Sequence, residues 1–203
     1  KLIRGHALAN LPDLLRELER NCERNGIRVH WAETAEEGNS IVLDILRRHG
    51  AELVIKGKSM VSEEMGLNAY LEAQGIEPVE TDLGEFILQL ADERPSHIIG
   101  PAIHKDRLEV AELFANHFPE IPSGEDIEGL TAAARQIMRE YFGRALAGVS
   151  GVNFAVAETG TRPAAPPRFP MNSSHCGEGR RSTWPRNVSM AASGSEAKLC
   201  DFQ

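Results

Sequence analysis

Two spacings of apolar residues recur through residues 1–161, one typical of helices and one typical of strands. Steps of three and four residues predict a first amphipathic helix, built on Leu11, Leu14, Leu15, Leu18 and Cys22. Similar spacing, together with glycines and with capping pairs such as Thr34 and Glu37, predicts further helices over 34–46, 63–74, 83–91, 106–117 and 123–142.

Short apolar or alternating runs between these helices predict strands over 27–31, 52–56, 76–80 and 97–100. Strands therefore alternate with helices, which predicts an α/β fold with a mainly parallel sheet flanked by helices. In such sheets ligands bind at the carboxyl ends of the strands, so the residues that follow each strand are the candidates for function.

The turn Lys56-Gly57-Lys58-Ser59-Met60 follows the second predicted strand and precedes a helix. Backbone N–H groups at a helix start attract anions, and two lysines add positive charge, so Lys58 and Ser59 are candidate anion-binding residues. A phosphate-binding P-loop is excluded, because Glu52 stands where that motif needs glycine. The alternative is a tight turn with solvated lysines.

Three further candidates follow the later predicted strands. Asp82 is interpreted mainly as a helix cap. His104 can exchange a proton near neutral pH beside Lys105, a candidate anion-binding residue, or it can hold a loop through hydrogen bonds. Glu158 lies amid apolar residues, so it is either a catalytic carboxylate or an internal tie to Lys58 or to backbone donors.

Composition narrows the function classes. The 203 residues carry a formal net charge of −8, which argues against a broad nucleic-acid surface, and no apolar run is long enough to span a membrane. The cysteines are Cys22, Cys176 and Cys200, and no C-x-x-C pair occurs. We therefore expect reduced thiols and neither a metal nor an iron–sulfur site within this chain.

Charge and periodicity both change near Thr161. Residues 1–161 contain 16 Lys and Arg against 27 Asp and Glu, a net charge of −11, whereas residues 162–203 contain 6 against 3, a net charge of +3. The second part also holds five of the eleven prolines, and it shows neither helical nor strand periodicity. We interpret 1–161 as an α/β domain and 162–203 as an irregular tail.

Five ordered segments resemble the signature of the lactate-utilisation iron–sulfur protein family, specifically the LUD domain of its B subunit. They are K-S-M-V-S-E-E-M-G-L-N at 58–68, E-T-D-L-G-E at 80–85, P-S-H-I at 95–98, P-A-I-H-K at 101–105 and N-F-A-V-A-E-T-G-T at 153–161. Each motif alone is weak, but five in one order over about residues 5–161 are specific.

The resemblance implies the fold of sugar-phosphate isomerases and CoA transferases. It also implies a cytoplasmic bacterial complex of three proteins that oxidises L-lactate to pyruvate. The full-length B subunit carries a ferredoxin-like region for two [4Fe–4S] clusters and is thought to pass electrons. The other subunits would be this chain's partners, a small carboxylate would be a ligand, and the chain would not be catalytic alone.

The chain departs from the family after Thr161, where Arg162-Pro163-Ala164-Ala165-Pro166-Pro167 replaces the family's apolar strand residues. We expect a domain truncated at its carboxyl end, with an open sheet edge. Residues 162–203 are interpreted as the product of a frameshift or a misread gene end, or as a divergent tail. Translating the gene in the other two frames distinguishes these alternatives.

Three functions therefore stay open. The first is a fragment of an electron-transfer subunit for lactate oxidation, in which Lys58 pairs with a carboxylate, His104 exchanges a proton and Glu158 orients one of them. The second is a stand-alone enzyme for a sugar phosphate or an acyl-CoA, with Glu158 as nucleophile. The third is a structural interaction domain.

Overall fold

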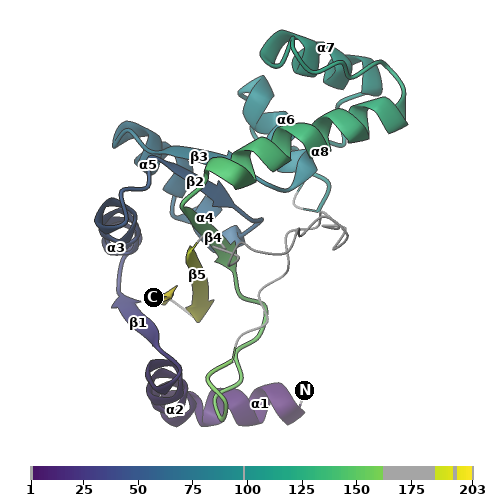
Figure 1. Ribbon diagram of the computed structural model, residues 1–203. Coiled ribbons are helices and arrows are strands. Elements are labelled where there is room, and N and C mark those ends of the chain that lie inside the picture. Colours follow the sequence, from purple (N-terminus) through teal and green to yellow (C-terminus); the bar gives the residue numbers. More distant parts are fainter. Residues whose placement is uncertain (1, 98, 162–185, 194–195, 203) are drawn as a thin grey trace, which may run out of the picture.

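The computed structural model of this protein describes residues 2–97, 99–161, 186–193 and 196–202 (Figure 1). The helices are α1 (Leu2–Ala9), α2 (Leu11–Arg24), α3 (Ala35–Arg48), α4 (Met60–Glu64), α5 (Leu67–Ala73), α6 (Leu83–Ala91), α7 (Arg107–His117) and α8 (Ile127–Arg144). The strands are β1 (Ile27–Ala32), β2 (Leu53–Lys56), β3 (Glu77–Glu80), β4 (Ala147–Gly151), β5 (Arg186–Ser193) and β6 (Glu196–Phe202).

One sheet joins the strands in the order β1-β6-β5-β4-β2-β3. Strand β2 pairs in parallel with β3 and with β4, and β4 pairs in parallel with β5, whereas β6 is antiparallel to both of its neighbours. The predicted α/β class, with a mainly parallel sheet flanked by helices, is confirmed.

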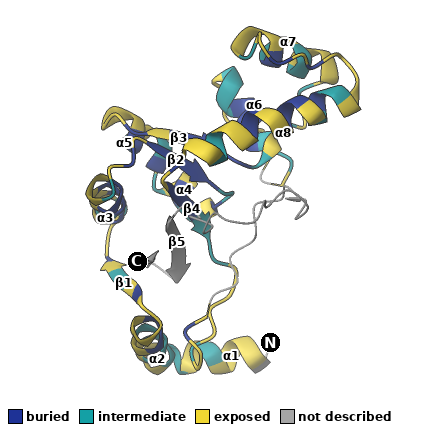
Figure 2. Ribbon diagram, viewed as in Figure 1, coloured by how far each residue is buried: buried dark blue, intermediate teal, exposed yellow. Residues whose placement is uncertain are grey.

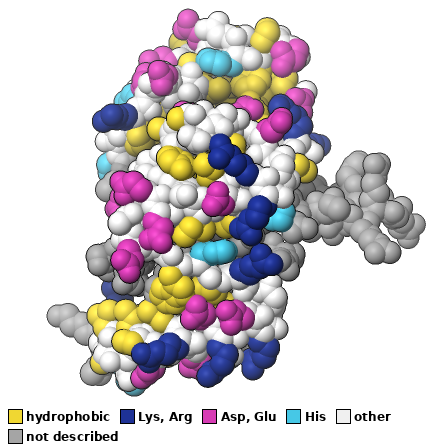
Figure 3. Space-filling model, turned by 90° about the vertical axis from the view of Figure 1, so that its left-hand side faces the viewer, with side chains coloured by type: hydrophobic (Ala, Val, Ile, Leu, Met, Phe, Trp, Pro, Cys, Tyr) yellow, Lys and Arg dark blue, Asp and Glu magenta, His cyan; other side chains and the backbone are white. Residues whose placement is uncertain are grey.

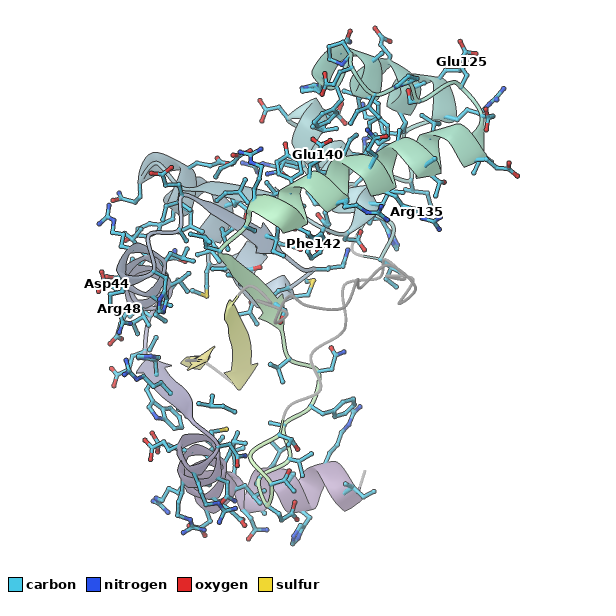
Figure 4. All side chains as sticks on the ribbon, viewed as in Figure 1. Asp44, Arg48, Glu125, Arg135, Glu140 and Phe142 are labelled. Carbon is cyan, nitrogen blue, oxygen red and sulfur yellow. The ribbon has the colours of Figure 1, made fainter. Side chains whose placement is uncertain are left out.

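Helices cover both faces of the parallel part of the sheet, so β2 is buried along its whole length (Figures 1 and 2). Val54 on one face of β2 packs with α3, α5 and β4. Leu53 and Ile55 on the other face pack with α6, α7 and α8. Phe142, labelled on α8 in Figure 4, lies partly buried against this second core. No helix in the described ranges is long and apolar enough to cross a membrane.

Two predicted elements differ from the structure. The predicted helix over 63–74 is split into α4 and α5, because Gly66 between them adopts a left-handed conformation with φ of 63°. The predicted strand over 97–100 is wrong, since its described residues form bends. Its backbone donors are used locally: the N–H groups of Ile99 and Gly100 donate to Nδ1 of His97.

Two strands, β5 and β6, lie within the stretch 162–203 that we interpreted as a mostly irregular tail. Strand β5 lies beside β4, with Val149 opposite Val188, so the edge of β4 that we expected to be open is paired. Strand β6 continues the sheet to β1. The proline-rich stretch after Thr161 lies outside the described residues.

The outer edge of the sheet at β3 is closed by a side chain. In this strand Pro78 and Glu80 direct their backbone groups away from β2, and Pro78 has no N–H to offer. The amide of Gln89 on α6 donates to the Pro78 carbonyl at 2.6 Å and accepts from the Glu80 N–H at 3.0 Å. This amide makes the hydrogen bonds that a neighbouring strand would otherwise make, which protects an edge that could pair with another chain.

Replacing Gln89 with Met is expected to lower the free energy of unfolding by about 1–3 kcal/mol, because the buried backbone groups of β3 lose their partner. Urea unfolding followed by circular dichroism measures the loss. Gln74→Met is the matched control, since Gln74 is exposed and its amide accepts only from the exposed Arg47. Equal effects of the two substitutions would contradict the assigned role of Gln89.

Candidate functional site

An ion pair is buried where β2 and β3 end side by side. Lys56 and Glu80 are the last residues of these strands and lie opposite each other in the register. Lys56 Nζ lies 2.7 Å from Glu80 Oε1, and the two side chains are only 3% and 7% exposed. Lys56 also donates to Ser62 Oγ at 3.1 Å, and Asn68 Nδ2 donates to Glu80 at 2.8 Å. Residues of two strands and two helices thus meet in one polar network.

The turn after β2 is held against the neighbouring strands. The Gly57 N–H donates to the Val149 carbonyl of β4 at 2.8 Å. Ser59 is buried and caps α4, since its side chain accepts from the Ser62 N–H. Gly151 at the end of β4 lies so close that a Cβ there would be 3.3 Å from the Ser59 Cβ. The ends of three parallel strands therefore surround this turn.

A second, more accessible ion pair lies beside the buried one. Lys58 Nζ contacts Glu85 Oε1 at 2.8 Å, with the Lys58 side chain 31% exposed and the Glu85 side chain 8% exposed. Glu85 lies in the first turn of α6, which follows β3 directly. Glu63 on α4 lies within the electrostatic field of Lys56, Lys58 and Glu85. We call Lys56, Lys58, Glu63, Glu80 and Glu85 the strand-end cluster.

Burial changes the acidity of two members of this cluster. Desolvation raises the pKa of Glu63 above its ordinary value, and the nearby Glu85 carboxylate adds to the rise. Desolvation also raises the pKa of Glu80, against the opposing effect of Lys56. Carboxyl groups with a raised pKa beside lysines at a strand end are typical of functional sites.

The sequence-predicted residues fall into three separate places. Lys58 and Ser59 lie together in the turn after β2, as predicted. His104 and Lys105 instead contact Glu93, which follows the end of α6. Glu85 lies in the first turn of α6 and Glu93 follows its last residue, so these contacts and the strand-end cluster lie at opposite ends of that helix. The predicted meeting of His104 and Lys58 at one sheet edge is wrong, because no strand over 97–100 leads His104 there.

His104 lies in a hydrogen-bonded chain on the surface. Its Nε2 is 2.8 Å from Glu93 Oε2, and its Nδ1 is 2.8 Å from Ser96 Oγ. Lys105 Nζ contacts the other Glu93 oxygen, and Ser96 also donates to the Pro101 carbonyl. These bonds close the loop from Glu93 to Lys105, in agreement with the loop-holding alternative for His104.

Acidification is expected to loosen this loop. Hydrogen bonds from Lys105 and His104 lower the pKa of Glu93 below its ordinary value of 4.5. Because the folded pKa is depressed, the stabilisation is present above the ordinary value and is lost as pH falls through the depressed pKa. Protection of the amides of residues 93–105 against hydrogen exchange, measured relative to the intrinsic exchange rate at each pH, should therefore fall between about pH 5 and pH 3. Glu93→Gln should show this low protection already at neutral pH; unchanged protection there would contradict this role.

Glu158 lies in a third place, on the loop between β4 and Thr161. Figure 1 shows this loop beside α1 and α2, well below β4. Asn21 Nδ2 of α2 donates to the backbone carbonyls of Ala157 at 2.7 Å and of Glu158 at 3.1 Å. The Glu158 side chain is exposed, so the expected internal tie runs through its backbone and not through its carboxylate.

Sequence reasoning missed four members of the strand-end cluster: Lys56, Glu63, Glu80 and Glu85. Each was within a segment singled out as a motif or as a strand end, but nothing in the local pattern distinguished a buried charge from an exposed one. The one available signal was register: charged residues at the last position of two adjacent parallel strands must lie side by side.

The residues in hand do not fit an iron–sulfur cluster. In the described ranges no group of three or more His, Cys, Asp or Glu side chains could hold a metal ion. Cys22 is buried in α2, and its Sγ donates to the Gly160 carbonyl at 3.5 Å. A thiol engaged in this way, with no second cysteine near it in sequence, lacks the Cys₄ arrangement that such clusters need.

A mainly parallel sheet flanked by helices, with paired lysines and glutamates at its strand ends, defines an α/β domain. The chain belongs to the LUD domain family, whose sequence pattern it matches over residues 15–162. The family resemblance expected from the five motifs is thereby confirmed.

Several relatives are similar over the same part of the chain. Lactate utilization protein B of Bacillus velezensis is 43% identical over 160 residues, which is 78% of this chain and 33% of that protein. The protein of the same name from Macrococcus caseolyticus is 47% identical over 160 residues, with the same shares. The uncharacterized electron transport protein YkgF of Escherichia coli K12 is 44% identical over 163 residues, again with these shares. The chain thus spans about a third of the length of these curated relatives. No solved structure matches it.

Proposed function

We propose that this chain supplies the LUD domain of an electron-transfer subunit that works in the oxidation of L-lactate to pyruvate. The observation that carries the proposal is the identity of more than 40% with proteins named for lactate utilization and electron transport, over three quarters of this chain. The domain would bind substrate or partner, while [4Fe–4S] clusters elsewhere in the full-length subunit would carry the electrons.

The placement of Glu158 weighs against a stand-alone acyl-CoA enzyme. A nucleophilic carboxylate needs neighbours that bind and polarise the acyl group. Glu158 is exposed on a loop held by α2, and the lysines of the strand-end cluster pair with Glu80 and Glu85 and not with Glu158. Neither Lys56 nor Lys58 therefore stands beside the Glu158 carboxylate to assist it as a nucleophile.

The face that Figure 3 shows has no continuous basic patch of the kind that binds polyanions. Acidic and basic side chains lie interspersed there, in keeping with the net charge of −8. We therefore take the partners to be the other subunits of a lactate-oxidising complex and a small carboxylate.

A chimeric protein tests the proposal. Residues 15–161 of this chain would replace the matching segment of lactate utilization protein B of Bacillus subtilis, which is 42% identical to it. The chimera should restore growth on L-lactate to a strain that lacks that protein. Growth on glucose is the control for general fitness, and the soluble yield of the chimera controls for folding. A chimera that is as soluble as the natural protein and restores no growth would overturn the proposal.

A further inference from the structure

The strand-end cluster has two parts with different access to solvent. Lys56 and Glu80 neutralise each other and are almost fully buried, with further bonds to Ser62 and Asn68. Lys56 and Glu80, which are buried and fully hydrogen-bonded, can position the turn after β2 but cannot contact a ligand. The open part consists of Lys58, Glu85 and Glu63.

The Lys58–Glu85 pair has the form of an occupied anion site. Glu85 is 8% exposed and is fixed in the first turn of α6, whereas Lys58 is 31% exposed and stands on a turn after β2. The carboxylate of Glu85 therefore occupies the position where an external carboxylate would meet the lysine. A ligand that binds Lys58 has to compete with this internal carboxylate.

We propose that Lys58, Glu85 and Glu63 form a binding site for a small monoanionic hydroxy acid, whose carboxylate replaces that of Glu85 at Lys58 and whose hydroxyl donates to the glutamate side chains. The proposal rests on the proposed function in its choice of ligand class and deepens it by assigning the ligand to these residues.

The charges of the open part favour this class over a phosphate or a phosphate ester. One lysine faces two glutamates, so the open part carries one net negative charge when both carboxyls are ionised. A dianion would meet two carboxylates and a single cation, Lys58, which is electrostatically unfavourable. A monoanion with a hydroxyl group uses the single cation for its own charge and offers a donor to the surplus acceptors.

Binding of an anion should be accompanied by uptake of a proton. The charges that act on Glu63 are those of Glu85 on α6, Lys56 at the end of β2, Lys58 in the following turn and Glu64 on its own helix. Its pKa is already raised by burial and by Glu85, and an additional anion would raise it further. The affinity for the anion should therefore fall as pH rises through the pKa of Glu63.

Isothermal titration of the full 203-residue chain with L-lactate, propionate and inorganic phosphate tests the site. L-Lactate should bind about tenfold more tightly than propionate, because only lactate offers a hydroxyl to a charged acceptor. Phosphate should bind more weakly than lactate. Titrations in two buffers of different ionisation enthalpy should show proton uptake. Absence of lactate binding, or tighter binding of phosphate, would overturn the proposal.

Three substitutions test whether these residues bind lactate directly or affect its binding only through the structure. Lys58→Met should abolish lactate binding, and Glu85→Gln should strengthen it several-fold, because the competing carboxylate is neutralised. Glu63→Gln should remove the proton uptake, which a merely structural residue would not do, and should weaken lactate binding, because the hydroxyl loses a charged acceptor. Arg16→Met breaks an exposed ion pair on α2 and is the control for charge loss. Lactate affinity unchanged in Lys58→Met, or reduced in Glu85→Gln, would overturn the assignment.

The two proposals fail in different ways. If the chimera restores growth while the chain binds no lactate, the site assignment is wrong and the proposed function stands. If the chain binds lactate with the expected pattern but the soluble chimera restores no growth, the site stands and the proposed electron-transfer function is wrong.

Discussion

Replacing Lys56 with Met is expected to lower the free energy of unfolding by about 3–5 kcal/mol. The substitution keeps the volume of the side chain but leaves the Glu80 carboxylate, 7% exposed, without its cation. Part of this cost would be avoided by protonation of Glu80, whose pKa burial already raises. Urea unfolding at pH 7 and at pH 5 measures the effect, and the loss should be smaller at pH 5.

The double variant Lys56→Met/Glu80→Leu provides the control. Removing both charges leaves no unpaired buried carboxylate, so a large part of the stability should return, less the cost of the partners that Ser62 and Asn68 lose. If Lys56→Met alone costs less than about 1 kcal/mol, as expected for an exposed pair, the burial described here is wrong. If the double variant is as unstable as the single one, the loss arises from packing and not from the unpaired carboxylate.

Replacing Gly160 with Ala is expected to detach residues 156–161 from α2. A Cβ at this position would lie 2.5 Å from the Asn21 carbonyl carbon and 2.7 Å from both the Asn21 oxygen and the Cys22 nitrogen. These are backbone atoms within a helix, so they cannot move aside as a flexible side chain would. The positive φ of 64° adds strain of about 1 kcal/mol. Amide exchange in the loop should rise at least tenfold, together with a loss of about 2–4 kcal/mol in unfolding free energy.

Gly50→Ala separates the two causes of this effect. Gly50 has nearly the same φ, 63°, but nothing lies within 4 Å of the position that its Cβ would take. It should therefore show only the backbone strain and leave exchange in residues 156–161 unchanged. Equal losses in Gly50→Ala and Gly160→Ala would mean that the close approach to α2 contributes nothing.

Local patterns were sufficient to predict most of the individual elements. Helix α6 has the predicted bounds Leu83–Ala91, whereas α8 begins at Ile127 and not at 123, because the Asp126 side chain caps it by accepting from the Gly129 N–H. The Thr34 side chain accepts from the Glu37 N–H, as predicted for a capping pair. The Glu37 carboxylate, however, accepts from the Glu33 N–H and not from the Thr34 N–H. These features depend on neighbours in the sequence, which is why the sequence reveals them.

Features that depend on distant contacts were less accessible to prediction. Residues 97–100 resemble a strand, yet the N–H groups of Ile99 and Gly100 donate to His97 Nδ1, and the Ser96 N–H donates to the Pro101 carbonyl, all within the loop. Strand β4 is composed of small residues, and only its position beside β2 makes it a strand. Glu85 was noticed as part of a motif, but its pairing with Lys58 required the fold to bring α6 next to the turn after β2.

The contact between Cys22 and Gly160 gives this domain a natural chemical reporter. Because the thiol is 1% exposed and is covered by the loop, alkylation of Cys22 requires the loop to lift from α2 first. Mass spectrometry can follow how fast Cys22 is alkylated. Alkylation that is faster than global unfolding would show that the segment after β4 opens as an independent unit.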